Sequence, residues 1–194
     1  DHRDLHSFPT RRSSDLYCGG ATPDRSGRQF VLSLERMNRI RSIDPLGFTL
    51  SLDAGVILAD AQAAAASENL MLPMSLGSEG SCRVGGNIGT NAGGLSVLRY
   101  GMTRDLVLGI EAVLADGSIL NDMRRLRKNN TGYDVKQSFI GGEGTLGIVT
   151  GVVFKLIPAP THHATGWLQL ADAPPLAQML ALVRRETADL VPPF

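Results

Sequence analysis

Hydrophobic and polar residues alternate in two segments of the first third of the chain, residues 29–34 (QFVLSL) and 49–54 (TLSLDA). Alternation with a period of two predicts half-buried β-strands, and these two segments could pair in one sheet. Residues 44–47 (DPLG) have the order typical of a type I turn. The alanine-rich segment 57–69 contains no Gly or Pro. It predicts a closely packed helix, for which no direct function is expected.

The middle of the chain carries a second set of strand signals. Residues 106–115 (LVLGIEAVLA) are strongly apolar and are followed by Asp116, Gly117 and residues 118–120. An Asp-Gly pair between two such segments predicts a β-hairpin. Residues 133–139 suit a short helix.

The pattern changes towards the C-terminal end. Residues 146–157 (LGIVTGVVFKLI) predict a β-branched strand that is closed by Pro158 and Pro160. Residues 165–170 suggest one more strand, and residues 174–190 predict an amphipathic helix that opens another lobe. Strands and helices are interleaved without a regular βαβ rhythm, so the expected fold class is α+β.

The first sixteen residues (DHRDLHSFPTRRSSDL) differ from the rest because they show neither helical nor strand periodicity. Residues 6–16 resemble the conceptual translation of a sequencing-adapter oligonucleotide. We therefore expect residues 1–16 to be a non-native tail, an assembly artefact in place of the true start. A disordered basic tail is the alternative.

Charge and cysteine content exclude several classes of protein. The chain of 194 residues has 19 Lys+Arg and 19 Asp+Glu, so its formal net charge is +0 and no broad basic surface is available for nucleic acid. Two cysteines, Cys18 and Cys82, indicate a reducing compartment. We expect a cytoplasmic location, with peripheral membrane association as the alternative. No apolar run is long enough to span a bilayer. The adjacent His162 and His163 would point to opposite faces of a strand, so no metal site is expected.

Glycine is concentrated in residues 18–20 (CGG), 76–94 (LGSEGSCRVGGNIGTNAGG) and 141–147 (GGEGTLG). Glycine lets consecutive backbone N–H groups turn towards a phosphate without any lysine. The Ser, Thr and Asn side chains of the middle segment can donate and accept hydrogen bonds, which suits the polar edge of an isoalloxazine ring. Glycine runs also form ordinary turns and loops, so the pattern alone leaves both interpretations open.

Other cofactor and catalytic motifs are missing from the sequence. Neither a GxGxxG between a strand and a helix nor a GxxxxGK[ST] motif occurs, which disfavours Rossmann and Walker nucleotide sites. GxSxG, HExxH and an evident acid/base pair are absent as well. A redox flavoprotein and a module that binds a flavin or nucleotide without redox chemistry therefore both stand as hypotheses.

Two long motifs resemble a known family. Residues 76–100 (LGSEGSCRVGGNIGTNAGGLSVLRY) resemble the central FAD-binding loop of flavoproteins of the vanillyl-alcohol oxidase and p-cresol methylhydroxylase (PCMH) type. Residues 127–149 (RKNNTGYDVKQSFIGGEGTLGIV) and 112–117 (AVLADG) are similar to the D-2-hydroxyglutarate, D-lactate and glycolate dehydrogenase branch. The resemblance runs from about residue 19 to residue 160.

The resemblance implies an FAD-binding domain of two α+β lobes and a separate C-terminal domain that covers the flavin. Residues 17–160 would be the FAD-binding domain without its N-terminal part, and residues 161–194 the truncated start of the substrate domain. The implied cofactor-binding residues are Gly19, Gly20, Gly77, Ser78, Ser81, Gly85, Gly86, Asn87, Thr90, Asn91, Gly93, Gly94, Glu143, Gly147 and Ile148. The residues implied to order their own loop as much as to contact the cofactor are Lys128, Asn130, Tyr133 and Asp134.

For the intact enzyme, the resemblance implies oxidation of a small D-2-hydroxy acid of the 2-hydroxyglutarate, lactate or glycolate class to the 2-oxo acid. Hydride would pass from C2 to FAD, and electrons would then pass to a separate acceptor. No histidine of the quoted motifs suggests a covalent link, so non-covalent FAD is expected.

Two departures from the family pattern limit this expectation. Only residues 18–20 remain of an upstream glycine-rich turn, and the chain ends at residues 192–194, before the region expected to carry the catalytic acid/base. We therefore expect no catalytic residue in this chain and no activity from it alone. A sugar-nucleotide reductase of the same flavin fold is a third hypothesis, disfavoured by residues 127–149. Pairing of subunits as a homodimer stays open.

Overall fold

The computed structural model describes residues 25–28, 32–162, 169 and 174–187. Its main feature is a five-stranded antiparallel sheet with the strand order β1-β2-β6-β4-β5. The strands of this sheet are β1 (Ile40–Asp44), β2 (Thr49–Asp53), β4 (Val107–Leu114), β5 (Ile119–Asp122) and β6 (Gly147–Lys155). A second sheet pairs β3 (Leu70–Met71) with β7 (Ile157–Pro158).

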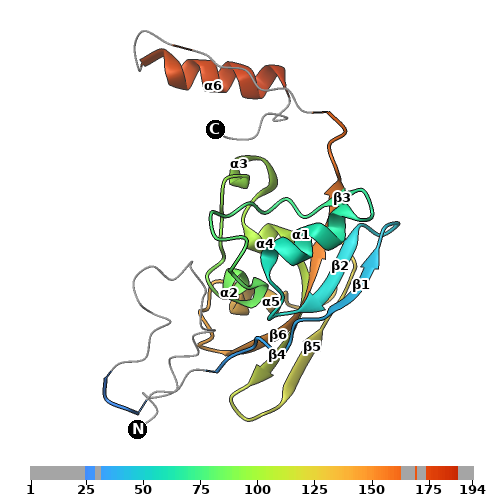
Figure 1. Cartoon of the computed structure of the whole chain (residues 1–194), viewed down its shortest axis with the longest axis vertical. Coiled ribbons are helices and arrows are strands. Elements are labelled where there is room, and N and C mark those ends of the chain that lie inside the picture. Colours follow the sequence, from blue (N-terminus) through green and yellow to red (C-terminus); the bar gives the residue numbers. More distant parts are fainter. Residues whose placement is uncertain (1–24, 29–31, 163–168, 170–173, 188–194) are drawn as a thin grey trace.

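Helices complete the fold. They are α1 (Leu58–Ala66), α2 (Val84–Gly89), α3 (Val97–Tyr100), α4 (Thr103–Leu106), α5 (Lys136–Phe139) and α6 (Pro174–Glu186). Figure 1 shows α1 crossing the sheet on one side, with α2 and α5 near the same end of β6. The mixture of an antiparallel sheet with separate short helices confirms the α+β class. Among the described residues, no helix is long and apolar enough to cross a membrane.

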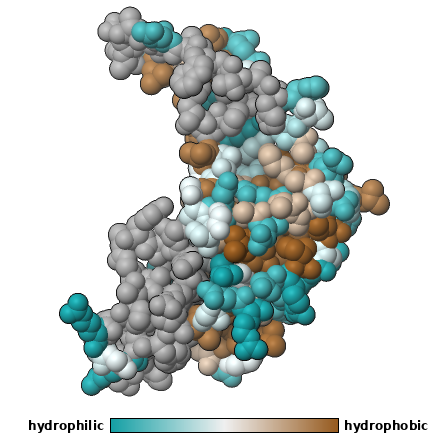
Figure 2. Space-filling view, viewed as in Figure 1, coloured by the Kyte–Doolittle hydropathy of each residue, from teal (hydrophilic) through white to brown (hydrophobic). Residues whose placement is uncertain are grey.

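The hydrophobic core lies between the large sheet and helices α1 and α2. Leu50 and Leu52 of β2 are fully buried, because alternate residues of a strand point to the same face. Helix α1 meets them with Leu58, Ala61 and Ala65, all of which are also fully buried. In the view of Figure 2, weakly hydrophobic colour covers α1 and a more hydrophobic group lies just beneath it.

The opposite face of the sheet is polar yet largely buried. Asp53 at the end of β2 has a side chain that is 1% exposed, and it pairs with Arg39 and Arg41 at 3.0 and 2.6 Å. Arg41 also pairs with Glu111 of β4 at 2.8 Å, and the Thr150 hydroxyl donates to the same carboxylate at 2.9 Å. This network joins strands β1, β2, β4 and β6 through charged hydrogen bonds.

The segment after β5 crosses this polar face. A Cβ atom on Gly109 would lie 2.3 Å from the carbonyl oxygen of Asp122 and 2.6 Å from the nitrogen of Arg124, so the backbone rests directly on the sheet. Further along, Arg125 donates to the hydroxyl of Ser42 at 2.7 Å, although the two residues are 83 positions apart. The segment after β5 thereby contacts both β4 and β1.

One predicted strand is wrong. The described part of the predicted strand at residues 29–34, residues 32–34, forms no strand, and the partner of β2 is β1. The turn predicted at residues 44–47 is confirmed, because the Asp44 carboxylate accepts the N–H groups of Leu46 and Gly47 at 3.1 and 2.9 Å. Strand β1 lacks a clear apolar alternation because its Arg41 forms ion pairs with Asp53 and Glu111.

The remaining predictions of secondary structure hold with smaller changes. The helix at 57–69, the strand at 106–115 and the hairpin at Asp116-Gly117 are confirmed as α1, β4 and the β4–β5 turn. The helix predicted for residues 133–139 begins only at Lys136. The strand at 146–157 divides into β6 and β7. The described part of the helix predicted at 174–190 forms α6, which ends at Glu186. The strand predicted at 165–170 lies outside the described residues except for residue 169.

Candidate cofactor site

The two ends of the middle glycine-rich stretch, residues 76–94, meet around one cavity. The cavity has a volume of about 360 Å³ and lies between residues 75–78 and residues 90–95. Six predicted cofactor-binding residues line it: Gly77, Ser78, Thr90, Asn91, Gly93 and Gly94. The described lining contains no ionisable side chain, so the cavity offers backbone amides, hydroxyls and one carboxamide.

Gly94 fixes the closest approach of the two walls. Its φ is +82°, and a Cβ atom there would lie 2.1 Å from the carbonyl oxygen of Ser75. The neighbouring Leu95 N–H donates to that carbonyl at 3.0 Å. Glycine at this position is therefore required by the fold itself, because any side chain would separate the walls.

Gly77 differs, since nothing in the described chain requires glycine there. Its φ is not positive, and a Cβ atom would have no neighbour within 4 Å. Gly80, in the same loop, has the same property. A missing side chain that faces open space leaves room for a ligand to approach the backbone closely.

The polar side chains of the cavity walls are mostly engaged within the protein. Thr90 donates its hydroxyl to the carbonyl of Gly86 at 3.0 Å, and Asn91 accepts the backbone N–H of Arg104 at 2.9 Å. Ser81 lies outside the cavity, where its hydroxyl donates to the carbonyl of Ser78 at 3.3 Å. These bonds hold the walls in shape and leave Ser78 and backbone groups for a ligand.

Helix α2 forms the support behind the cavity. Gly85 packs so closely on Ala54 that a Cβ atom would lie 3.0 Å from the Ala54 carbonyl oxygen, and its N–H donates to that oxygen at 2.8 Å. Asn87 is fully buried and donates to the sulfur of Cys82 at 3.5 Å. The structure thus places Gly85, Gly86 and Asn87 under the cavity rather than in its lining.

The third glycine-rich stretch docks on the C-terminal end of α2. The N–H groups of Gly141 and Glu143 donate to the carbonyls of Ile88 and Gly89, both at 2.9 Å. Glu143 is exposed and has a positive φ of 49°. Gly147 lies further on, where β6 begins, and a Cβ atom there would lie 2.6 Å from the Val113 carbonyl oxygen. Ile148 follows it and is half-buried. Glu143 is therefore near the cavity wall, whereas Gly147 and Ile148 lie against β4.

Arg104 was not anticipated from the sequence, although it connects these parts. Its backbone N–H donates to Asn91, and its guanidinium donates to the Gln137 side chain at 2.7 Å and the Ile140 carbonyl at 2.8 Å. One side chain thus joins the cavity wall to the segment before Gly141. An isolated arginine in a four-residue helix carries no recognisable motif, so no sequence signal could have identified it.

The other predicted residues fall in different places. Gly19 and Gly20 lie outside the described residues. In the loop that follows β5, Tyr133 is 98% exposed. Burial opposes ionisation of Asp134, but hydrogen bonds from Lys136 and Gln137 outweigh it and hold the pKa of the carboxyl below its usual value. This loop does not line the cavity, which agrees with an ordering role.

Comparison with known proteins identifies the fold family. Residues 10–122 match the family model described as FAD binding domain. The chain belongs to the FAD binding domain family. The structure is also similar to the solved structure of alkyldihydroxyacetonephosphate synthase, with a TM-score of 0.63 and 26% identity. The similarity covers 74% of this chain and 26% of that protein. The resemblance to FAD-dependent flavoproteins is confirmed.

The relatives with known names belong to the expected branch. The chain is 43% identical over 166 residues to the mitochondrial D-2-hydroxyglutarate dehydrogenase of Bos taurus, covering 86% of this chain and 30% of the relative. It is 48% identical over 148 residues to a putative mitochondrial D-lactate dehydrogenase of Schizosaccharomyces pombe, covering 75% and 28%. The chain thus spans less than a third of the length of these two relatives.

FAD is the cofactor of this family, and the cavity fits it. The diphosphate needs N–H donors that approach closely, and the open backbone at Gly77 supplies such an approach without a side chain in the way. The uncharged lining also suits a flat ring system with polar edges. Among the described residues no group of three or more His, Cys, Asp or Glu is placed to hold a metal ion.

Proposed function

We propose that this domain serves a flavin-dependent oxidoreductase that oxidises a small D-2-hydroxy acid to the 2-oxo acid. The chemistry supplied by FAD is acceptance of the hydride from C2 of the substrate. The single observation that carries the proposal is the open backbone at Gly77 within an uncharged cavity, in a chain 43% identical to a D-2-hydroxyglutarate dehydrogenase.

In this proposal the chain's own residues bind and position the cofactor. Gly77, Ser78 and Gly93 offer backbone and hydroxyl donors from the two walls, and Asn91 keeps its wall in place through Arg104. Gly85, Gly86 and Asn87 act indirectly by supporting the walls. Glu143, Gly147 and Ile148 are proposed to lie along the nucleotide side. Non-covalent FAD is part of the proposal.

The proposal divides the chain into two units. Residues 17–160 form the FAD-binding unit, supported by the large sheet and by β7, which ends at Pro158. Residues 161–194, with α6, open the unit that would carry the substrate-binding groups. Since the described cavity lining has no ionisable side chain, the catalytic acid/base is assigned to that unit and not to the cavity.

The proposal includes three further predictions. Electrons pass from the flavin to a separate acceptor, the protein is located in the cytoplasm, and two subunits pair as a homodimer. The relatives reported above are mitochondrial proteins by name. A reducing compartment is compatible with the buried position of Cys82.

A chimera tests the proposed activity. The segment of the bovine dehydrogenase that matches this chain over 166 residues is exchanged for the segment from this chain. The chimera should bind FAD, and anaerobic D-2-hydroxyglutarate or D-lactate should bleach the flavin absorbance, whereas L-2-hydroxyglutarate should not. A chimera that holds stoichiometric FAD and is bleached by no 2-hydroxy acid would contradict the proposal.

The second candidate is a flavin-binding module without redox chemistry. It is favoured by the described cavity lining, which carries no group that could transfer a proton. The same experiment separates the two, because a module would keep FAD oxidised in the presence of every hydroxy acid even when the downstream unit is supplied.

A further inference from the structure

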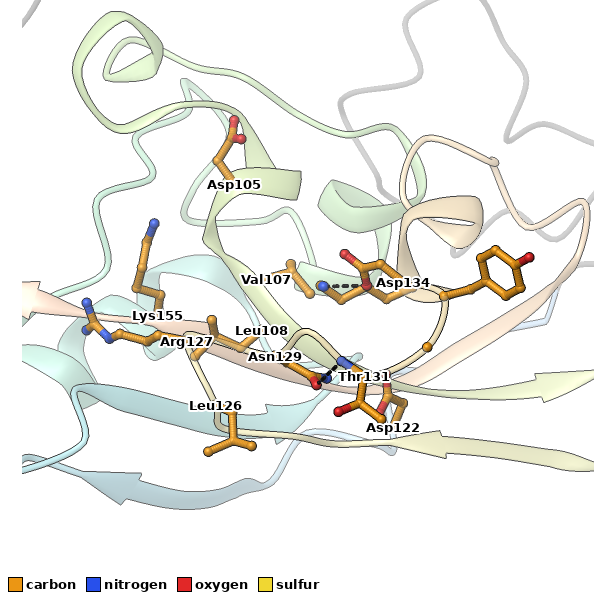
Figure 3. Close-up of a pocket in the computed structure, with 13 residues that line it drawn as sticks. Asp105, Val107, Leu108, Asp122, Leu126, Arg127, Asn129, Thr131, Asp134 and Lys155 are labelled. Atoms are coloured by element: carbon orange, nitrogen blue, oxygen red, sulfur yellow. Dashed lines mark hydrogen bonds and ion pairs between the residues drawn. The ribbon is translucent and has the colours of Figure 1, made fainter.

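A second cavity lies apart from the cofactor cavity, and the proposed function does not use it. It has a volume of about 430 Å³ and lies between the start of β4 and the loop at residues 126–134 (Figure 3). Helix α4 separates the two cavities: Thr103 donates its N–H to Ala92, which lines the cofactor cavity, at 3.0 Å, while Asp105 lines the second cavity. We call the second cavity the α4 cleft.

Most charges in the α4 cleft are paired within the protein. Lys136 lies 2.5 Å from the carboxylate of Asp134, an interaction drawn as a dashed line in Figure 3. Asp122 lies 2.5 Å from Arg124. The carboxylate of Asp105 accepts the N–H of Met102 at 2.8 Å and thereby caps α4.

Arg127 and Lys155 are the exceptions. Among the residues that the structure describes, neither forms an ion pair with a carboxylate. Arg127 is held in place by a hydrogen bond to the Leu156 carbonyl at 3.1 Å and by the ring of Phe48, 5.7 Å away. Lys155 is half-buried at the last position of β6. Figure 3 shows both side chains at one end of the cleft, with Asp134 at the other.

Neutral donors line the neighbouring part of the same cleft. The Asn129 carbonyl oxygen accepts the N–H of Thr131 at 3.1 Å, so its amide NH₂ group is directed elsewhere. The hydroxyl of Thr131 has no acceptor among the described residues. This part of the cleft therefore holds two cations that form no ion pair within the described part of the chain, together with an amide group and a hydroxyl group. All four can donate hydrogen bonds, and a ligand that accepts them would fit here.

We propose that the α4 cleft binds a small oxyanion, a carboxylate- or phosphate-bearing ligand, with Arg127 and Lys155 as its cationic contacts. Arginine offers a planar pair of donors to an oxyanion, and lysine adds a compact charge. Partial burial of Lys155 strengthens its attraction for an anion relative to that of a fully solvated lysine. The proposal uses no residue of the cofactor cavity, so it stands independently of the proposed function.

NMR titration of the whole chain tests this proposal. Backbone amide shifts are followed while sodium phosphate or sodium succinate is added at constant ionic strength, with sodium chloride as the reference. Saturable shifts are expected at residues 126–132 and at Lys155. The more effective of the two anions identifies the source of the oxyanion. Mapping on the unmodified protein makes the result independent of any variant.

A matched pair of variants sharpens the assignment. Lys155→Gln should weaken binding roughly tenfold, because it removes one of two charged contacts. Arg36→Gln removes a positive charge from an exposed position outside the cleft lining and should leave binding unchanged. Shifts that do not saturate, that chloride reproduces, or that both variants reduce equally would overturn the proposal.

Discussion

Arg41 Nε lies 2.6 Å from the Oδ1 atom of Asp53, whose side chain is 1% exposed, on the polar face of the sheet. The same guanidinium pairs with Glu111 at 2.8 Å, so one arginine holds two carboxylates. Removing one partner from such a group leaves a buried charge uncompensated. The network is therefore a point of high sensitivity in the fold.

Arg41→Met should lower the free energy of unfolding by about 3 kcal/mol, because Asp53 would keep only the exposed Arg39 as its partner. Urea unfolding followed by circular dichroism measures the change. Arg36→Met is the matched control, since Arg36 is exposed, and it should change stability by less than about 0.5 kcal/mol. Equal effects of the two substitutions would show that the buried network contributes nothing specific.

The same network predicts acid sensitivity. Hydrogen bonds from Arg41 lower the pKa of Glu111 from its ordinary 4.5 despite burial; burial opposes ionisation of Asp53, but Arg41 and Arg39 outweigh it and lower its pKa from 3.8. The unfolded chain then binds more protons at acid pH, so stability rises with pH there. The stabilisation is fully present above the ordinary pKa values of the two carboxyls in the unfolded chain. It is lost as the pH falls through their lowered pKa values in the folded protein.

Unfolding measured across the acid range checks this prediction. The free energy of unfolding of the wild type should fall below about pH 4.5. Asp53→Asn should show a shallower dependence, since one of the titrating carboxyls is gone. Parallel pH profiles for the two proteins would show that Asp53 does not contribute to acid unfolding.

Gly94→Ala should destabilise the fold by about 3 kcal/mol, because a Cβ atom there would lie 2.1 Å from the Ser75 carbonyl oxygen at a φ of +82°. Gly117→Ala is the control for conformation alone: its φ is +83°, but the position is open, so its cost should be about 1 kcal/mol. Thermal or urea unfolding of both variants measures the difference. Similar losses would mean that contact with Ser75 is unimportant.

Arg104→Met should loosen the segment that docks on α2. The variant loses the hydrogen bonds to Gln137 and Ile140, which are part-buried. Hydrogen exchange of the amides at residues 137–143 should become faster, while the amides of β2 and β6 should keep their protection. Unchanged exchange in residues 137–143 would show that the loop is held by its backbone bonds to Ile88 and Gly89 alone.

The sequence predicts those elements whose hydrophobic pattern belongs to one face of the sheet. Strand β4 and helix α1 are examples, since both bury apolar side chains in the core. Strand β1 could not be predicted from its local pattern. The cost of burying its Arg41 is offset by ion pairs with Asp53 and Glu111, which lie far away in the sequence.

The candidate site could be located from the glycine-rich stretches, but the role of each residue could not. Gly94 and Gly85 are required by backbone packing, whereas Gly77 borders open space, and all three look alike in a sequence. Asn87 carries a side chain typical of a binding loop, yet it is fully buried beneath the cavity. The distances that separate these roles arise only when distant segments come together.

The affinity of the bovine chimera for FAD, with and without Gly77→Ala, tests the central claim most directly. The account predicts that the substitution leaves the free energy of unfolding of the FAD-free protein unchanged, because a Cβ atom at Gly77 meets nothing within 4 Å of the described chain. It also predicts FAD binding weakened about tenfold or more, since a methyl group forced into a filled contact costs about 1–3 kcal/mol. A chimera that binds FAD equally well with alanine at this position would contradict the assignment of the cavity to the cofactor.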